Sequence, residues 1–300
     1  MANIRYLKDR IKAVGNICQI TRAMEMVATT KLRRFQSRAE ASGPYAREIE
    51  GLVETLGAGA DLGGEGGHPL FAKRDGKRTA ILIVTSDRGL CGAYNANAML
   101  RLRDWEAANS DRELHRFVIG KKGMSYLHRR NLEVDSYLEK PSLEQMGYAD
   151  AARVAQLFVR EVTEDRLDEV FVLYTAFKSM TRYEPTVFPF LPLGQADDGV
   201  EADAQDDAPA SGSGANILLQ PSSKQIFDRL VPKYLESRMF NVLIESLTSE
   251  YASRRVSMTK ATDAATDMVG ELKRHYNRAR QERITKELLE IVGGAEALNG

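Results

Sequence analysis

The chain has 300 residues, of which 43% are hydrophobic and 28% are charged, so it can form one or two globular domains with a sizeable core. Its 42 basic and 42 acidic residues cancel to a formal net charge of zero, which argues against wholesale nucleic-acid binding. Two cysteines, Cys18 and Cys91, and four scattered histidines show neither disulfide-framework nor metal-ligand spacing. We therefore expect no metal site, and no apolar run approaches the ~18 residues of a membrane span.

The first predicted element is one long amphipathic helix over residues 1–58. Its apolar stripe changes register near residue 17, which predicts uneven supercoiling against a partner helix. The stripe consists of Ile4, Leu7, Ile11, Val14, Ile17, Ile20, Met24 and Val27. Gly43 and Pro44 predict a bend within this helix rather than its end. Residues 1–38 carry nine basic and two acidic side chains, a composition that would also suit a mitochondrial transit peptide.

Residues 70–192 predict a small α/β domain in which strands alternate with helices. Strands are expected at 78–86, 115–120, 132–138, 168–177 and 184–191, and helices between them up to 108, over 121–131 and over 143–165. Such alternation favours right-handed crossovers and a mostly parallel sheet. The predicted fold class is therefore α/β, with a small Rossmann-like domain inserted in sequence between two long terminal helices.

Two further segments complete the predicted organisation. Residues 193–221 predict an acidic flexible linker, because six acids and no base fall within 195–215 and large apolar side chains are nearly absent. Residues 222–298 predict a second long helix with a heptad seam. The seam occupies positions 244, 247, 251, 254, 258, 261, 265, 268, 272, 275 and 279, with Arg254 and His275 as its irregular members. Because each terminal helix needs a partner for its stripe, we predict that the two pair as a long antiparallel coiled coil.

The segment "SDRGLCGAYN" (residues 86–95) is the main candidate for chemistry. A strand, a glycine turn and a helix start are where helix amides could hold a phosphate. The segment lacks GxGxxG and GK[ST], and the second strand ends in Gly120 and Lys121 rather than an acid. These features favour a tight packing turn, stabilised by Asp87 and Arg88, and no bound cofactor. A nucleotide-binding α/β enzyme and a coiled-coil scaffold are the alternative functions.

Three segments resemble those of one known family, in the family's order. They are "ITRAMEMVATTKLRR" (20–34), "TSDRGLCGAYNANAM" (85–99) and "RARQERITKELLEIVGGAEAL" (278–298). Together they resemble the gamma subunit of bacterial F-type (F1Fo) ATP synthase over about residues 3–298. The resemblance implies a subunit without catalytic residues of its own, which acts as the central rotor shaft. Such a shaft couples proton-driven rotation of the c-ring to ATP synthesis, or ATP hydrolysis to rotation.

The same resemblance implies the partners and the place of work. The partners are the alpha and beta subunits of F1, the epsilon subunit, the c-ring of Fo and, indirectly through the complex, delta, with no nucleic acid. The expected location is peripheral, at the cytoplasmic face of the bacterial inner membrane. Because the match begins almost at the first residue, it favours a bacterial chain over a transit peptide. The plant chloroplast form of the family carries a thiol-regulated insertion with two cysteines, but the corresponding region here is acidic and lacks cysteine, so no thiol switch is expected.

Five residues of this chain match family positions that contact the catalytic subunits. By this match, Met24 and Arg254 would face beta in the stalk. Arg280, Gln281 and Thr285 would meet beta higher in the ring. The basic residues between 273 and 283 then suit an acidic protein partner or a solvated face better than nucleic acid.

Overall fold

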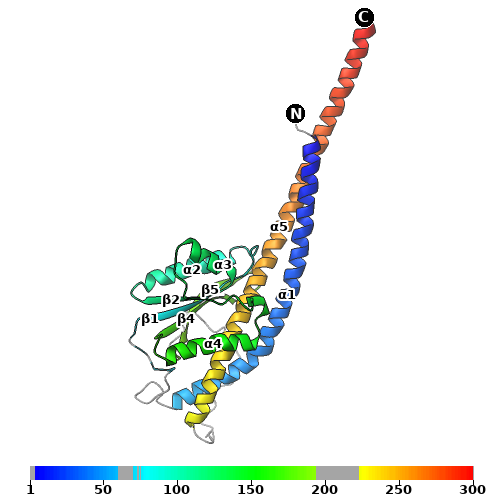
Figure 1. The fold of residues 1–300 in the computed structure, drawn as a ribbon. Coiled ribbons are helices and arrows are strands. Elements are labelled where there is room, and N and C mark those ends of the chain that lie inside the picture. Colours follow the sequence, from blue (N-terminus) through cyan, green and yellow to red (C-terminus); the bar gives the residue numbers. More distant parts are fainter. Residues whose placement is uncertain (1–3, 60–69, 73, 75, 194–222, 300) are drawn as a thin grey trace. The chain divides into compact units, whose positions relative to one another are not determined.

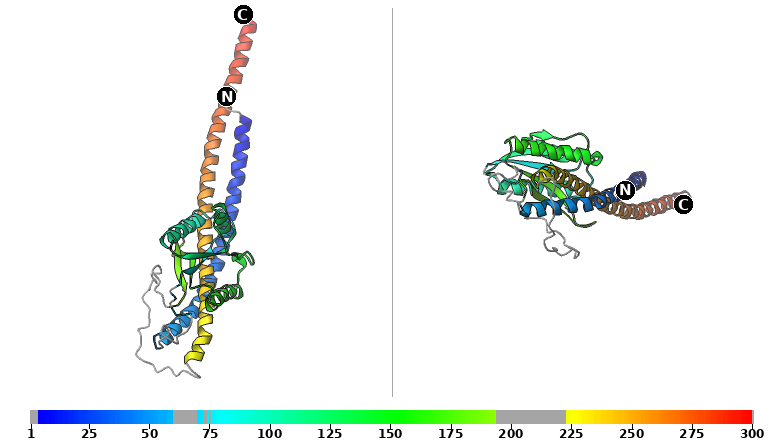
Figure 2. Two further views of the ribbon diagram at one scale, coloured as in Figure 1. Left: turned by 60° about the vertical axis from the view of Figure 1, so that its left-hand side comes forward. Right: turned by 90° about the horizontal axis from the view of Figure 1, so that it is seen from below.

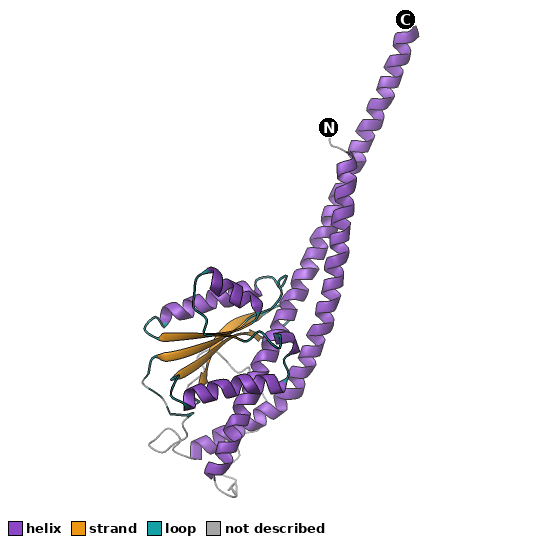
Figure 3. Ribbon diagram, in the orientation of Figure 1, coloured by secondary structure: helices purple, strands orange, loops and turns teal. Residues whose placement is uncertain are grey.

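The computed structural model describes residues 4–59, 70–72, 74, 76–193 and 223–299. The chain divides into two compact units: a helical unit of Met1–Thr30 with Arg254–Gly300, and a mixed unit of Lys31–Ser253. The two longest helices, α1 (Ile4–Gly59) and α5 (Ser223–Asn299), each have residues in both units. Figure 3 shows the strands of the mixed unit in orange among the purple helices. The predicted linker at 193–221 lies, apart from Leu193, outside the described residues.

The mixed unit contains a five-stranded sheet in the order β3-β2-β1-β4-β5. The strands are β1 (Arg78–Val84), β2 (Glu113–Ile119), β3 (Ser136–Tyr137), β4 (Glu169–Phe177) and β5 (Tyr183–Leu191). The first four lie parallel, and β5 closes one edge antiparallel to β4. The predicted mostly parallel sheet is thereby confirmed. The third strand is shorter than the expected 132–138, as is common for a strand at a sheet edge.

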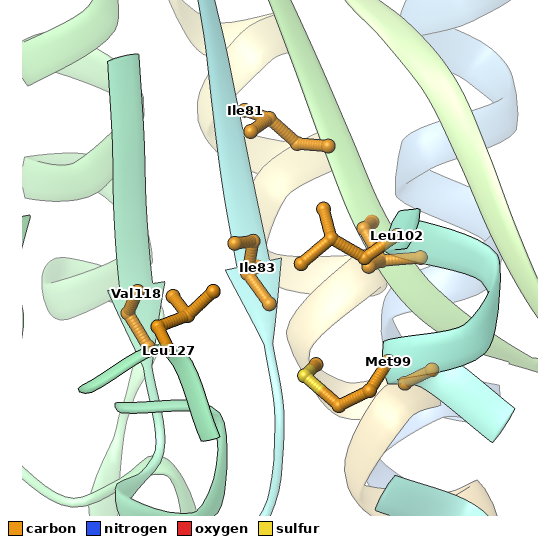
Figure 4. Close-up of a cluster of buried hydrophobic side chains, with 8 residues drawn as sticks. Ile81, Ile83, Met99, Leu102, Val118 and Leu127 are labelled. Atoms are coloured by element: carbon orange, nitrogen blue, oxygen red, sulfur yellow. The ribbon is translucent and has the colours of Figure 1, made fainter. Parts of the chain in front are cut away.

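Two helices cover one face of this sheet, α2 (Tyr94–Ala108) and α3 (Lys121–Arg129). Figure 4 shows the apolar cluster that joins them to β1 and β2. Its labelled members are Ile81, Ile83, Met99, Leu102, Val118 and Leu127. Because every second residue of a strand points to the same face, the two isoleucines of β1 both enter this cluster.

The opposite face of the sheet packs against α4 (Tyr148–Thr163) and α5. Phe117 neighbours Val118 on β2 but points to this other face, where its ring lies 5.0 Å from that of Phe158 on α4. Arg238 of α5 stacks 4.7 Å from the ring centroid of Phe188 on β5. The helix expected at 143–165 begins only at Tyr148, after the 3-10 turn η1 (Leu143–Gln145). The mixed unit is therefore a three-layer structure, with helices on both sides of one sheet (Figure 1).

Prolines stand inside both long helices without ending them. Pro44 lies within α1 and Pro232 within α5, although a proline in a helix interior costs about 3 kcal/mol. Nearby apolar side chains are buried, among them Ile49 of α1 and Val231 and Leu235 of α5. Tertiary packing thus offsets the local cost, and the helix predicted to pass Pro44 does so.

In the helical unit α1 and α5 pair antiparallel, as Figure 1 and the left view of Figure 2 show. Cys18 Sγ lies 3.4 Å from Thr266 Oγ1, and Thr262 Oγ1 donates a hydrogen bond to Thr21 Oγ1 at 2.8 Å. The predicted antiparallel coiled coil is confirmed by this register. The same register places Ile4 level with about residue 280 of α5, so the end of α5 extends past α1.

The seam of α1 keeps one register, so the predicted shift near residue 17 is wrong. Ile17, Ile20 and Val27, which suggested the shift, are 52–59% exposed. The side chains turned toward α5 at this level are the small polar ones that bond to it, followed by the buried Ala28. Small seam residues let two helices approach closely. The largest apolar side chains of this stretch are consequently left on the outside.

The seam of α5 departs from its predicted positions at two places beyond Ala265. Met268 and His275 are exposed, whereas Val269 and Tyr276 are half-buried. Leu272 and Ala279 keep their predicted places, so the steps after Ala265 run four, three, four, three instead of three, four, three, four. Among the described helices, none is apolar over a stretch long enough to cross a lipid bilayer.

A disulfide tests the antiparallel register of the helical unit. In a Cys91→Ala background, we expect Thr266→Cys to form a disulfide with the native Cys18 on mild oxidation. Cys18 Sγ and Thr266 Oγ1 are 3.4 Å apart. A sulfur in place of that oxygen would lie near Cys18 Sγ, and the two sulfurs of a disulfide are about 2.05 Å apart. Mobility on a non-reducing gel and intact mass give the yield. Met268→Cys, on the exposed side of α5, is the matched control, and equal yields for the two variants would contradict the register.

Candidate functional site

The glycine turn after β1 satisfies its own polar groups. Ser86 N donates to Asn95 Oδ1 at 3.1 Å, and Ser86 Oγ donates to the carbonyl oxygen of Arg88 at 2.7 Å. Leu90 and Gly92 take the positive φ values of 62° and 56° that reverse the chain. The segment thus forms the tight turn that its sequence predicts.

The turn leads into α2, where Tyr94 N donates to Cys91 O at 3.2 Å. The start of α3, after β2, is a second position where helix amides could bind a phosphate, and the chain itself occupies it. First-turn amides of a helix have no intrahelical acceptor and otherwise attract anions. Here the donor and acceptor pairs are Lys121 N with Asp87 Oδ1 (3.0 Å), Lys122 N with Ser86 O (3.0 Å) and Gly123 N with Thr85 Oγ1 (2.9 Å). Asp87 therefore stabilises the turn by capping the next helix, and these three amides are not available to a nucleotide.

A pocket of about 270 Å³ lies beside this turn, and the charges that line it do not favour a phosphate group. Three carboxylates, those of Asp87, Glu144 and Glu250, line it together with Arg88 and Lys121. An excess of acids repels a phosphate group. Within the described part of the chain, no group of three or more His, Cys, Asp or Glu side chains could hold a metal ion.

The helical unit exposes large apolar side chains instead. On α1 these include Ile20, Met26 and Val27. Near the end of α5, five side chains are 46–68% exposed, namely Ile284, Leu288, Leu289, Ile291 and Val292. Large exposed apolar surfaces on a protein mark contacts with other proteins. The surface of this unit is the candidate functional site.

Three of the five predicted contact residues share that surface. Arg280, Gln281 and Thr285 are all exposed on the part of α5 that extends past α1. Among the described residues, Arg280 has no hydrogen-bond or ion-pair partner. Met24 is half-buried, and Arg254 is only 6% exposed. The structure thus groups three of these residues on one helix end but leaves Arg254 little surface to offer a partner.

In the mixed unit, buried polar groups fasten α5 to the sheet and to α2. Tyr94 OH lies 2.7 Å from Ser246 Oγ, and the amide of Phe177 donates to a carboxylate oxygen of Glu245 at 2.8 Å. Burial raises the pKa of both the Tyr94 phenol and the Glu245 carboxyl. No local sequence pattern signals these contacts, because their partners are far apart in the chain.

Glu236 makes a second polar attachment of α5, to α4. It is buried, and it accepts hydrogen bonds from Gln156 Nε2 at 2.9 Å and Lys233 Nζ at 2.7 Å. Burial would raise the pKa of Glu236, but the bonds from Lys233 and Gln156 outweigh it, so the pKa is lowered. An ionised carboxylate at neutral pH therefore holds these two helices together.

These features define the class of protein: a two-helix coiled coil together with an α/β domain, with large apolar side chains exposed on the outside of the helices. The family model described as ATP synthase matches residues 3–298. The chain is 36% identical to the ATP synthase gamma chain of Geotalea uraniireducens over 100% of both chains. It is 38% identical to that of Brevibacillus brevis over 98% of both chains. The chain belongs to the gamma-chain family of ATP synthase.

Solved structures of more distant proteins share the fold. A chain of the Euglena gracilis mitochondrial ATP synthase aligns with a TM-score of 0.66 at 19% identity, covering 98% of this chain and 94% of its own length. A chain from the central stalk and c-ring structure of the Tetrahymena thermophila mitochondrial enzyme aligns with a TM-score of 0.57 at 22% identity. That alignment covers 81% of this chain and 99% of the other.

Gly120 offers a test of how the turn before α3 is closed. Its φ is +100°, and an added Cβ would lie 2.1 Å from the carbonyl oxygen of Thr85. We expect Gly120→Ala to destabilise the mixed unit by more than about 1–3 kcal/mol, the usual cost of a strained backbone, because the clash adds to the strain. Gly15→Ala is the control, because nothing lies within 4 Å of a Cβ there. Urea unfolding monitored by Trp105 fluorescence gives the comparison, and equal midpoints would contradict the close approach.

Proposed function

We propose that this chain is the central rotor shaft of an F-type ATP synthase. In this role it couples proton-driven rotation of the membrane c-ring to ATP synthesis in the ring of alpha and beta subunits, and ATP hydrolysis to rotation in the reverse direction. The chain carries out no chemistry itself. The observation that carries the proposal is the apolar outer surface of the helical unit, with Ile17, Ile20 and Val27 on α1 and the apolar end of α5.

That surface needs a surrounding partner for a physical reason. Between residues 17 and 28 the seam takes the small side chains of α1, so Ile17, Ile20 and Val27 stay 52–59% exposed beside α5. Burying such side chains is favourable by roughly 1.5–3 kcal/mol each relative to exposure. A sleeve of alpha and beta subunits would supply that burial, whereas a self-contained scaffold would leave these residues in water.

The coupling mechanism follows from unequal contacts. A two-helix coil presents different side chains on each side, so the beta subunits around it meet different surfaces at any instant. A contact shifts a conformational equilibrium only if its free energy differs between the two conformations. Rotation of this asymmetric surface would therefore move each beta subunit in turn through nucleotide sites of different affinity.

Individual contacts are assigned by the family match and by exposure. We assign Arg280, Gln281 and Thr285 to the upper contact with beta, and Met24 to a contact in the stalk. The guanidinium of Arg280 has a fork of donors suited to carboxylates, and the amide of Gln281 both donates and accepts. For Arg254 a direct contact with beta stays a prediction, which its 6% exposure does not favour.

The remaining partners belong to the same complex. The epsilon subunit and the c-ring of Fo would bind the α/β domain, and delta would be linked indirectly through the complex. The chain would work in the F1 sector, as a peripheral part of a membrane-bound complex at the cytoplasmic face of the bacterial inner membrane. The nucleotide-binding enzyme is not favoured, because the turn after β1 lacks GxGxxG and GK[ST] and bonds to itself through Ser86 and Asn95. The amides at the start of α3 are bonded to Asp87 and Thr85.

Replacing both Arg280 and Gln281 with alanine tests the upper contact. Alanine keeps helix propensity, but the change removes charge-assisted hydrogen bonds of about 1.5–3 kcal/mol each. In the reconstituted complex we expect ATP hydrolysis and synthesis to fall more than fivefold, on the order of one such bond. The isolated chain should keep its melting temperature.

The matched control is Lys286→Ala with Glu290→Ala. These two residues are also exposed, and since each residue turns the helix by about 100°, both lie at least about 80° around α5 from Arg280 and Gln281. A change in rate of about twofold corresponds to less free energy than one charged hydrogen bond. If the Arg280/Gln281 variant turns over ATP within about twofold of the unchanged complex, these residues do not form the contact.

A further inference from the structure

Three side chains from three segments of the mixed unit meet at Glu144. Lys31 lies on α1, Glu144 in η1 between β3 and α4, and Tyr251 on α5. Lys31 Nζ donates to Glu144 Oε1 in an ion pair and lies 3.4 Å from Tyr251 OH. Tyr251 OH donates to the other carboxylate oxygen, Oε2, at 2.8 Å. Each oxygen of one carboxylate therefore holds a different long helix; we refer to the three residues as the Glu144 cluster.

The surroundings of the Glu144 cluster fix its geometry. The buried ring of Tyr251 packs against the buried ring of Phe35, with centroids 5.4 Å apart. The Lys31 ammonium also lies 5.5 Å from the centroid of the Tyr251 ring. The side chains of Lys31 and Glu144 are 28% and 29% exposed, so water competes less for their charges than at an open surface.

The charge state of Glu144 suits this role. Burial would raise the pKa of its carboxyl, but the hydrogen bonds from Lys31 and Tyr251 outweigh burial, and the pKa is lowered. The carboxylate is thus ionised at neutral pH and can accept from both helices at once. A neutral amide at this position would keep the size of the side chain but lose the charge that Lys31 requires.

The Glu144 cluster lies where the two long helices leave the mixed unit. Lys31 is the first residue of the mixed unit on α1, and Tyr251 is two residues before its end on α5. Both helices continue without interruption beyond these points. The cluster therefore ties the α/β segment to both helices at the level where each helix leaves the mixed unit.

We infer that Glu144 is a positioning residue for torque transmission, which makes α1 and α5 turn together with the α/β segment. Separate bonds hold α5 to α2, to the sheet and to α4, through Ser246, Glu245 and Glu236 in turn. The Lys31–Glu144 ion pair adds a direct bond between that segment and α1. Gln36 Nε2 of α1 also lies 4.0 Å from Met180 Sδ, between β4 and β5. That contact is long and involves no charged pair, so loss of the ion pair would weaken the attachment of α1 to the segment while the bonds of α5 remain. This inference rests on the rotor function proposed above.

The test is the angular fluctuation of a bead attached to the α/β domain of this chain in single complexes of alpha, beta and gamma subunits during ATP hydrolysis. We expect Glu144→Gln to widen the angular variance at each pause about twofold, because it removes one charge-assisted bond between segments. The mean hydrolysis rate should stay close to that of the unchanged complex. Tyr251→Phe keeps the ring packing against Phe35 and should widen the variance in the same direction but less.

Controls separate this role from general damage to the fold. Glu139→Gln removes a carboxylate that forms an ion pair with Lys121 of α3 at 3.6 Å, a pair that involves neither α1 nor α5. This variant should leave the angular variance unchanged. The exchange Lys31→Glu with Glu144→Lys should restore part of the stiffness lost in Glu144→Gln. If Glu144→Gln prevents assembly, Tyr251→Phe decides the matter.

The outcomes distinguish this inference from the function on which it rests. If complexes with the unchanged chain rotate and both variants show the unchanged variance, the role of Glu144 is overturned while the rotor function stands. A wider variance in the Glu139→Gln control, equal to that of Glu144→Gln, would also overturn it. Complexes of the unchanged chain that hydrolyse ATP without rotating would overturn the rotor function itself.

Discussion

The structure depends on one constraint: two helices from opposite ends of the chain must share a narrow seam. In the helical unit that seam is made in part by Cys18, Thr21 and Thr262, whose side chains are small and bond across it. Because the inward side of α1 is small between residues 18 and 28, the bulky side chains of Ile17, Ile20 and Val27 lie outward and are exposed. The intervening segment has to bring the chain back so that the helices run antiparallel. The exposed surface and the proposed function are both consequences of this pairing.

The α/β segment shows how a fold can persist without the chemistry for which it is best known. Its parallel strands and the turn after β1 have the arrangement of a phosphate-binding domain, yet this turn bonds to itself through Ser86 and Asn95, and Asp87 and Thr85 take amides at the start of α3. Fold alone does not define function. Here polar groups of the domain, such as Tyr94 of α2 and Gln156 of α4, bind α5 instead. In the proposed rotor, the α/β domain transmits rotation to the two long helices.

Sequence patterns predicted the sheet and the helix pairing well, because both rest on strong local periodicity. The predicted seam positions were wrong where large apolar side chains lie on the exposed surface of the chain instead of in its core. Ile17 and Ile20 are the most apolar residues of their stretch, so they were assigned to the seam, but they lie outside it. The contact residue Arg280 was found only through the resemblance, since an exposed basic residue carries no local signal. The Glu144 cluster joins residues 113 and 107 positions apart, a distance over which one sequence reveals no pairing.

The most direct test of the account is whether this chain turns. Complexes of this chain with alpha and beta subunits would be fixed to a surface through the ring of alpha and beta subunits, and a bead would be attached to the α/β domain of this chain. The account predicts stepwise rotation in one direction that requires ATP, and no rotation when the α1–α5 pair is cross-linked to beta near Arg280. ATP hydrolysis at the full rate with the chain cross-linked to the ring in this way would contradict it.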